Sequence, residues 1–291
     1  MSEPLKVLTI AGSDSGGAAG LQADLRAFAA LGVYGMSVVT AVTAQNSVAV
    51  DAVHYLPPAL VRAQLDAVLR DYGAAAVKTG FLGRPELIIA VSAGLQAHRC
   101  RRVVVDPVLV NHRGAAMFPP IVPQLLRLYL LPLAVLLTPN RHEAAVLLHS
   151  PPPAADDLAS LAEMARALQR LGARHVLLKG GRSGADRVDL LCSGADVREL
   201  RTPFVETANT HGAGDTLSAA LAALLASGAE LHAAVGEALA FLDQALDAGF
   251  RPGMGNVIPD RLFWALAPED EEEPGAEEGG ELTPRDPRHV H

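Results

Sequence analysis

The amino-acid sequence predicts an α/β protein with a central, mostly parallel sheet and helices on both faces. Three observations support this fold class. Short apolar, β-branched runs alternate along the chain with longer Ala- and Leu-rich stretches that have helical spacing. The apolar runs are continuous, as in strands that are covered on both faces. Half of the 291 residues are hydrophobic but only 4% are aromatic, which favours helix-on-sheet packing over an aromatic-rich β barrel.

The first part of the chain supplies alternating strands and helices. Residues 6–10 are expected to form the first strand, because their apolar run stops at Gly12. A helix over residues 20–31 follows, with apolar side chains at helical spacing and Gly32 as its C-terminal stop. The same reasoning predicts strands over residues 33–42, 75–78 and 102–106, and helices over residues 58–72 and 85–97.

The alternation continues in the second part of the chain. Residues 134–138 and 175–179 are expected strands, and residues 188–192 and 197–201 are expected to pair as a hairpin. Helices are expected over residues 140–148, 156–171, 213–226 and 231–248. Because strands and helices alternate throughout, most neighbouring strands should be parallel.

The charge of the protein is concentrated at its C-terminus. Residues 268–291 hold nine acidic residues and two arginines, or −7 of the net charge of −8, and they lack any periodicity. We therefore expect one domain over residues 1–267 and a disordered acidic tail over residues 268–291. The domain has 22 basic and 23 acidic residues, so it offers no basic field to nucleic acid.

Several further classes of protein are disfavoured. Cys100 and Cys192 stand 92 positions apart and form no metal-binding or disulfide pattern. The N-terminus lacks the basic and apolar regions of a signal peptide, and the most apolar stretch, residues 115–140, is interrupted by Arg127 and by prolines that include Pro119, Pro120, Pro123 and Pro132. We expect a cytoplasmic protein without membrane partners.

Polar and glycine-rich segments follow six of the expected strands. In parallel sheets, the carboxyl ends of strands are where ligands bind. Turn chemistry explains any one of these segments, but six in the same topological position indicate a binding site. The segments are residues 11–17, 43–46, 78–80, 106–107, 138–140 and 179–181.

The strongest local motif is the segment 209–216, Asn-Thr-His-Gly-Ala-Gly-Asp-Thr, directly before an apolar helix. The small residues Gly212, Ala213 and Gly214 would let backbone amides approach an anion at the helix N-terminus. Asp215 would lie in the first turn, either as a base beside this anion hole or as a simple helix cap. Walker A, GxGxxG, HExxH and GxSxG motifs are absent from the sequence.

Taken together, these segments resemble a known family. Residues 11–20 (Ala-Gly-Ser-Asp-Ser-Gly-Gly-Ala-Ala-Gly) and 22–25 (Gln-Ala-Asp-Leu) resemble the opening of hydroxymethylpyrimidine/phosphomethylpyrimidine kinases, which belong to the ribokinase-like superfamily. The resemblance covers residues 5–260 in the family's order. Its further segments are Leu31 to Gly35, Thr43 to Asn46, Lys78 to Gly80, Val105 to Val108, Thr138 to Asn140 with Glu143, Lys179 to Gly181, and Asn209 to Gly212.

The resemblance implies an ATP- and Mg²⁺-dependent kinase of thiamine biosynthesis. Such an enzyme phosphorylates the hydroxymethyl group of 4-amino-5-hydroxymethyl-2-methylpyrimidine and then the resulting monophosphate. The resemblance also implies a homodimer and roles for matching residues. On the substrate side, the pyrimidine would be held by Gly12, Asp24 and Gln45, with Phe81 and Val108 as apolar walls. On the nucleotide side, ATP would be contacted by Asn140, Lys179 and Thr210, and magnesium would be held by Glu143 and Asp106. The anion hole would be formed by Gly212, Ala213 and Gly214, and Asp215 would act as the catalytic base.

Asp215 is also a departure from the pattern of this family, which usually has cysteine there. Sugar kinases and many pyridoxal kinases of the same superfamily use aspartate as the base, so a pyridoxal kinase is an alternative. A second alternative is a non-catalytic homologue that binds the pyrimidine, because the loop at Asn111–Gly114 and the segment Gly253–Asn256 also depart from the family pattern. The carboxylate at position 215 argues against loss of catalysis.

Overall fold

A single sheet of nine strands runs through the protein, in the order β3-β2-β1-β4-β5-β6-β7-β8-β9. The computed structural model describes residues 3–111, 113–203 and 211–263, and the structural statements below refer to these residues. The central neighbours β2, β1, β4, β5, β6 and β7 pair in parallel, whereas β3, β8 and β9 are antiparallel additions at the two edges. The mostly parallel sheet predicted from the sequence is therefore confirmed.

The strands differ in length from the centre to the edges. The short central strands are β4 (Ala76–Thr79), β5 (Val103–Val105) and β6 (Ala134–Leu137). The longer strands are β1 (Lys6–Ser13), β2 (Tyr34–Gln45), β3 (Val50–Tyr55), β7 (His175–Ser183), β8 (Asp186–Ser193) and β9 (Asp196–Pro203).

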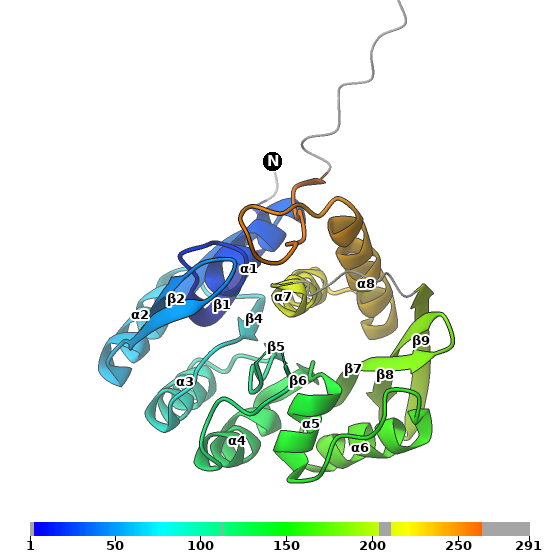
Figure 1. The fold of residues 1–291 in the computed structure, drawn as a ribbon. Coiled ribbons are helices and arrows are strands. Elements are labelled where there is room, and N and C mark those ends of the chain that lie inside the picture. Colours follow the sequence, from blue (N-terminus) through cyan, green and yellow to red (C-terminus); the bar gives the residue numbers. More distant parts are fainter. Residues whose placement is uncertain (1–2, 112, 204–210, 264–291) are drawn as a thin grey trace, which may run out of the picture.

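Helices cover both faces of the sheet, as Figure 1 shows. One face carries α1 (Gly20–Ala30), α7 (Ala213–Ala226) and α8 (Leu231–Asp247). The other face carries α2 (Pro58–Asp71), α3 (Pro85–Ala97), α4 (Ile121–Leu125), α5 (Arg141–Leu148) and α6 (Leu158–Arg170). A π-helical turn (Leu126–Leu130) and a 3₁₀ turn (Leu131–Leu133) extend α4.

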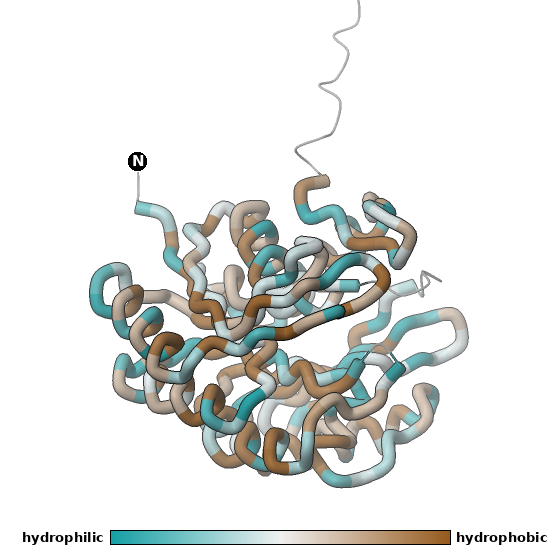
Figure 2. The backbone as a smooth tube through the Cα atoms, turned by 60° about the vertical axis from the view of Figure 1, so that its left-hand side comes forward, coloured by the Kyte–Doolittle hydropathy of each residue, from teal (hydrophilic) through white to brown (hydrophobic). Residues whose placement is uncertain are grey.

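Two hydrophobic cores result, one on each face of the sheet. Side chains alternate between faces along a strand, so Val103 and Val105 enter the core under α2 to α6 while Val104 enters the core under α1, α7 and α8. Figure 2 shows hydrophobic and hydrophilic residues alternating along the chain, including within the coils of the helices. Within the described residues, no helix is both long and apolar enough to cross a membrane.

Two segments were not predicted from the sequence: β3, and the helical segment over residues 121–133 that consists of α4 and the two turns after it. Five of the six residues of β3 are exposed and Tyr55 is half-buried, so the strand carries no buried apolar pattern. The second segment contains prolines, which are unfavourable inside helices, so its sequence does not predict a helix. The structure also extends the expected strands at 6–10, 33–42 and 175–179 to Ser13, Gln45 and Ser183.

Candidate active site

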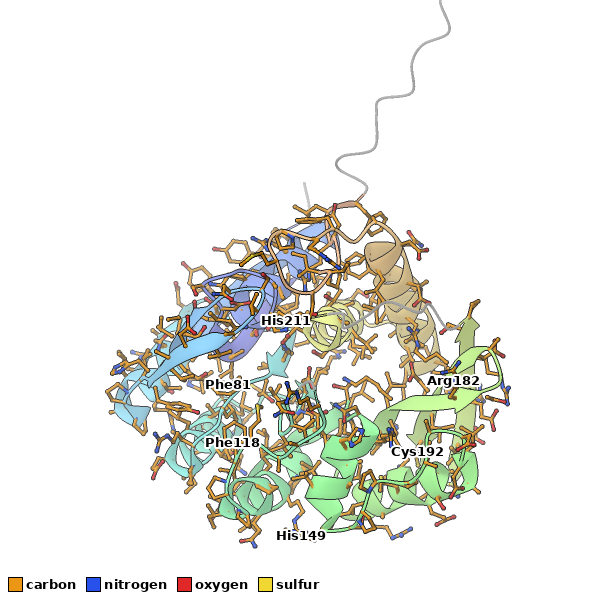
Figure 3. The ribbon with its side chains drawn as sticks, viewed as in Figure 1. Phe81, Phe118, His149, Arg182, Cys192 and His211 are labelled. Carbon is orange, nitrogen blue, oxygen red and sulfur yellow. The ribbon has the colours of Figure 1, made fainter. Side chains whose placement is uncertain are left out.

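A cavity of about 810 Å³ opens at the carboxyl ends of the parallel strands. Its walls come from the exits of β1, β2, β4, β5 and β6, from the start of α7, and from β3. In Figure 3, His211 lies beside α7, and Phe81 and Phe118 lie on the side toward α3 and α4. The predicted ligand edge of the sheet is therefore hollow, with a volume that suits a small molecule.

Glycines allow the backbone segments around the cavity to approach each other closely. Gly20 has a φ of +57°, and a Cβ there would come within 2.4 Å of the carbonyl oxygen of Gly12. Gly212 has a φ of +83°, and a Cβ there would lie 1.9 Å from the carbonyl oxygen of Ala18. Both positions exclude a side chain, so the loop before α1 packs directly against the loop before α7.

An aromatic wall lines one side of the cavity. The Phe81 ring lies between Tyr55 and Phe118, with ring centroids 5.8 Å and 5.7 Å apart. Val108 lines the cavity from the exit of β5, in a left-handed conformation with a φ of +42° that β-branched residues rarely adopt. Phe81 and Val108 thus lie at the cavity wall, where the sequence resemblance expected them.

Gln45 and His211 bring hydrogen-bonding groups to the opposite wall. The Nε2 atoms of Gln45 and His211 are 3.0 Å apart, and His211 Nε2 is 3.8 Å from an Asp14 carboxylate oxygen. Asp14 accepts hydrogen bonds from the amides of Gly16, Ala18 and Ala19, which order the loop before α1. Gly12 and Gln45 both line the cavity, and the rest of the loop holds them there.

Asp215 lies in the first turn of α7 and lines the cavity. Its side chain is 18% exposed, and its Oδ1 accepts a hydrogen bond of 3.0 Å from Lys78 Nζ. Burial opposes ionisation, but the Lys78 ammonium and the Gly20 amide outweigh it and hold the pKa of Asp215 below its ordinary value. Asp215 is thus a carboxylate at neutral pH, directed at the cavity, which suits a proton acceptor.

Asp24 lies elsewhere than the resemblance suggested. Its side chain is fully buried beneath the cavity, where it accepts hydrogen bonds of 2.7 Å and 2.9 Å from Lys78 Nζ and one from the hydroxyl of Thr9. Burial raises the pKa of Asp24 to about 7 against the opposing charge of Lys78. Asp24 does not line the cavity, and its carboxylate contacts Lys78 instead.

The residues expected at the nucleotide occupy two places: Asn140 lines the cavity, and Lys179 lies beside the start of α7. A Cβ at Gly214 would lie 3.6 Å from Lys179 Nζ and 3.7 Å from Asp106 Oδ2, so both side chains approach the small residues at the helix start. Asp106 also accepts a hydrogen bond of 3.0 Å from Ser218. Gly212 and Asp215 line the cavity, whereas Ala213 packs against the core under α1, α7 and α8 and Gly214 lies beside Lys179 and Asp106.

Asn140 and Glu143 form a capping box at the start of α5. The Asn140 side chain accepts from the amides of His142 and Glu143, and Glu143 accepts from the Asn140 amide. Glu143 also accepts from the amide of Leu109, which the unusual backbone of Val108 presents. Burial, and then the nearby charge of Asp106, raise the pKa of Glu143 to about 7. Two mutually repelling buried carboxylates suit a cation.

Sequence reasoning missed two cations that organise the site. Lys78 was assigned only to a strand exit, yet its side chain is fully buried between two carboxylates. Arg261 is 2% exposed and donates to the carbonyl oxygens of Ala18 and Gly212 and to Thr216. A lysine inside an otherwise apolar strand was an available signal; Arg261 carried none. Thr210, expected at ATP, and His112 lie outside the described residues.

A carboxylate beside the glycines at the start of an apolar helix, next to a small-molecule cavity at the strand ends, defines a small-molecule kinase of the ribokinase-like class. Comparison with known proteins identifies the family. The family model described as phosphomethylpyrimidine kinase matches residues 14–260, so the chain belongs to this family of phosphotransferases.

The relatives include one protein of similar length and one longer protein. The chain is 47% identical over 262 residues to the hydroxymethylpyrimidine/phosphomethylpyrimidine kinase of Rhizobium meliloti, covering 88% of this chain and 97% of that protein. It is 46% identical over 265 residues to the thiamine biosynthesis bifunctional protein ThiED of Geobacter sulfurreducens, covering 91% of this chain. This chain spans 53% of the length of that bifunctional protein.

A solved structure confirms the ribokinase-like fold. The pyridoxal kinase of Bacillus subtilis, in its ADP complex, superimposes with a TM-score of 0.84 at 34% sequence identity. The match covers 91% of this chain and all of that chain.

Proposed function

We propose that this protein transfers the γ-phosphoryl group of ATP to the hydroxymethyl group of 4-amino-5-hydroxymethyl-2-methylpyrimidine, and then to the phosphate of the product, in thiamine biosynthesis. The observation that carries the proposal is the placement of the Gln45 amide and the Asp215 carboxylate around one cavity. An amide offers both a donor and an acceptor, which matches a ring nitrogen beside an amino group. The names of the relatives support the same substrate class.

The aromatic wall and Gln45 would orient the pyrimidine with its hydroxymethyl group toward Asp215. Asp215 would accept the hydroxyl proton as the oxygen attacks the γ-phosphorus, and the bond from that phosphorus to the ADP oxygen would break. The amides at the start of α7 would stabilise negative charge on the transferred group. In the second reaction the phosphate of the monophosphate would take the place of the hydroxyl group as the nucleophile.

The residues on the phosphate side fit a magnesium ion. Asp106 and Glu143 supply buried carboxylate oxygens of the kind that Mg²⁺ prefers, and phosphates and water would complete its coordination. The ion would neutralise charge on the ATP phosphates. Lys179 and Asn140 would contact the nucleotide, because both lie beside this pair: Lys179 lowers the pKa of Glu143, and Asn140 shares its capping box.

Pyridoxal kinase is the second candidate. Two observations favour it: the carboxylate at position 215 and the close superposition on the pyridoxal kinase of Bacillus subtilis. Pyridoxal also carries a hydroxymethyl group on an aromatic nitrogen ring, so the same cavity chemistry applies. A non-catalytic binding protein is the third candidate, but Asp215 retains the position and the ionised state that catalysis needs.

One assay separates the three candidates. The protein is incubated with Mg-ATP and, separately, hydroxymethylpyrimidine, its monophosphate and pyridoxal, and the release of ADP is followed. We expect turnover of both pyrimidines and little or none of pyridoxal. Turnover of pyridoxal alone would overturn the proposal, and tight pyrimidine binding without ADP release would favour the non-catalytic homologue. The homodimer and the cytoplasmic location stay predictions of the sequence.

A further inference from the structure

We propose that Lys78 and Asp24 act as a positioning pair that orients Asp215 and balances its charge before and after it accepts a proton. This inference rests on the proposed function, because it assigns Asp215 the role of base. It also gives Asp24 a role that differs from the substrate contact implied by the sequence resemblance.

The geometry places one ammonium between two carboxylates. Lys78 projects from β4 toward α1 and α7, and its Nζ lies 2.7 Å and 2.9 Å from the two oxygens of Asp24 and 3.0 Å from Oδ1 of Asp215. The side chains of Lys78 and Asp24 are fully buried, whereas Asp215 alone reaches the cavity. Only Asp215 can therefore meet a substrate, and the other two act through it.

Contacts on several sides fix the orientation of Asp215. Lys78 approaches from β4, the Gly20 amide approaches from the start of α1, and the start of α7 carries Asp215 itself. The charged groups that face this cluster among the described residues are Asp24, Asp106 and Arg261. The carboxylate is thus held in one direction before the substrate arrives, which is how a positioned base gains efficiency.

The second carboxylate matters when the proton moves. Before transfer, two carboxylates share one ammonium. After Asp215 accepts the substrate proton it becomes neutral, and a lysine paired with it alone would be left as an uncompensated buried charge, which is strongly unfavourable. Once Asp215 is neutral, its charge no longer raises the pKa of Asp24, so Asp24 ionises more readily beside Lys78 and keeps that charge paired. Asp24 therefore makes a buried lysine compatible with both halves of the catalytic cycle.

The test compares four variants with the wild type: Asp24→Asn, Lys78→Met, the double variant of both, and the control Lys6→Met. Lys6 is a strand lysine that pairs with Glu3, away from the cavity, so its variant should retain wild-type kinetics. The values of kcat and KM are measured for the pyrimidine between pH 5.5 and 9. The free energy of unfolding is measured in urea at one pH for all five proteins.

The positioning role predicts distinct kinetic changes. Lys78→Met should lose about 10²-fold or more in kcat. In the pH profile of its remaining kcat, the midpoint of the acid limb should shift to higher pH by about 1–3 units, because Asp215 loses its nearby cation. Asp24→Asn should lower kcat about tenfold without changing KM for the pyrimidine. Wild-type kcat and pH profile in Lys78→Met, or a raised KM with unchanged kcat in Asp24→Asn, would overturn the proposal.

The unfolding measurements do not depend on turnover. Each single variant removes one member of the buried Lys78–Asp24 pair, and the second substitution then has no pair left to break, so the double variant should lose less stability than the sum of the two single losses. Strictly additive losses would contradict the pairing. If the wild type phosphorylates none of the substrates but the unfolding free energies of the two single variants are still non-additive, the proposed function is wrong while the interaction between Lys78 and Asp24 is confirmed. If Lys78→Met does not fold, the double variant should show the raised acid limb, and its absence would overturn the proposal.

Discussion

Two buried carboxylate pairs lie on opposite sides of the start of α7, and they handle charge differently. Asp24 and Asp215 share the ammonium of Lys78 at hydrogen-bond distance. Asp106 and Glu143 have no such ion pair among the described residues, and Lys179 acts on Glu143 only through its field. The first pair contains its own cation, which leaves Asp215 free to exchange a proton. The second pair is short of positive charge, which suits a cation that arrives with the nucleotide.

The pKa values express this difference. Lys78 holds the pKa of Asp215 below its ordinary value even though the site is buried. Glu143, equally enclosed but lacking a bonded cation, has a pKa raised to about 7. Burial penalises both groups, and the lysine is not sufficient alone, because Asp24 beside the same Lys78 has a pKa raised to about 7. At Asp215 the Gly20 amide and the charge of Arg261 add to Lys78 and keep the group ionised.

The largest expected effect is on the pair with the built-in cation. Asp215→Asn removes the proton acceptor but keeps the shape of the side chain, so kcat should fall by about 10²- to 10⁴-fold with little change in KM for the pyrimidine. Steady-state kinetics with saturating Mg-ATP measure this. An Asp215→Asn protein with full activity would remove the base from this account.

A different parameter should change when the second pair is altered. Glu143→Gln keeps the capping box but removes one of the two charges offered to magnesium, so KM for Mg-ATP should rise about tenfold while KM for the pyrimidine stays the same. Kinetic titrations of each substrate distinguish the two constants. A rise in KM for the pyrimidine with no change in KM for Mg-ATP would contradict a role of Glu143 in binding magnesium.

The sequence predicted the fold and the edge of the sheet that carries the site, but not the charge balance. The bounds of α3 and α7 were predicted correctly, because helix periodicity and proline or glycine boundaries are local signals. The partners of Lys78 lie 54 and 137 residues away along the chain, so no local pattern reveals them. The same holds for Arg261, whose contacts with Ala18 and Gly212 exist only once the loops meet.

The pH dependence of stability should also reveal Asp24. Its pKa rises from 3.8 to about 7 on folding, so between these values the folded protein binds more protons than the unfolded chain. The free energy of unfolding should therefore fall as pH rises from about 4 to 7. Asp24→Asn should flatten this slope by about half, since Glu143 contributes in the same direction. Urea unfolding at pH 5 and pH 8 measures it; an unchanged slope would contradict the shift.

The smallest effect is expected from the acidic C-terminus. Residues 268–291 carry −7 of the net charge of −8, and the family match ends at residue 260. Truncation after residue 267 should leave kcat and both KM values within about twofold at physiological ionic strength, where exposed charges are screened beyond roughly 8 Å. A large loss of turnover in the truncated protein would show that the two carboxylate pairs do not account for the charge balance alone.

The difference between the two pairs can be measured directly. The rates of wild type, Asp215→Asn and Glu143→Gln are followed at saturating pyrimidine and ATP while the Mg²⁺ concentration is raised. We expect excess Mg²⁺ to restore much of the activity of Glu143→Gln and none of that of Asp215→Asn, because only the second pair binds an external cation. Rescue of Asp215→Asn by Mg²⁺, with none for Glu143→Gln, would contradict the separate roles assigned to the two pairs.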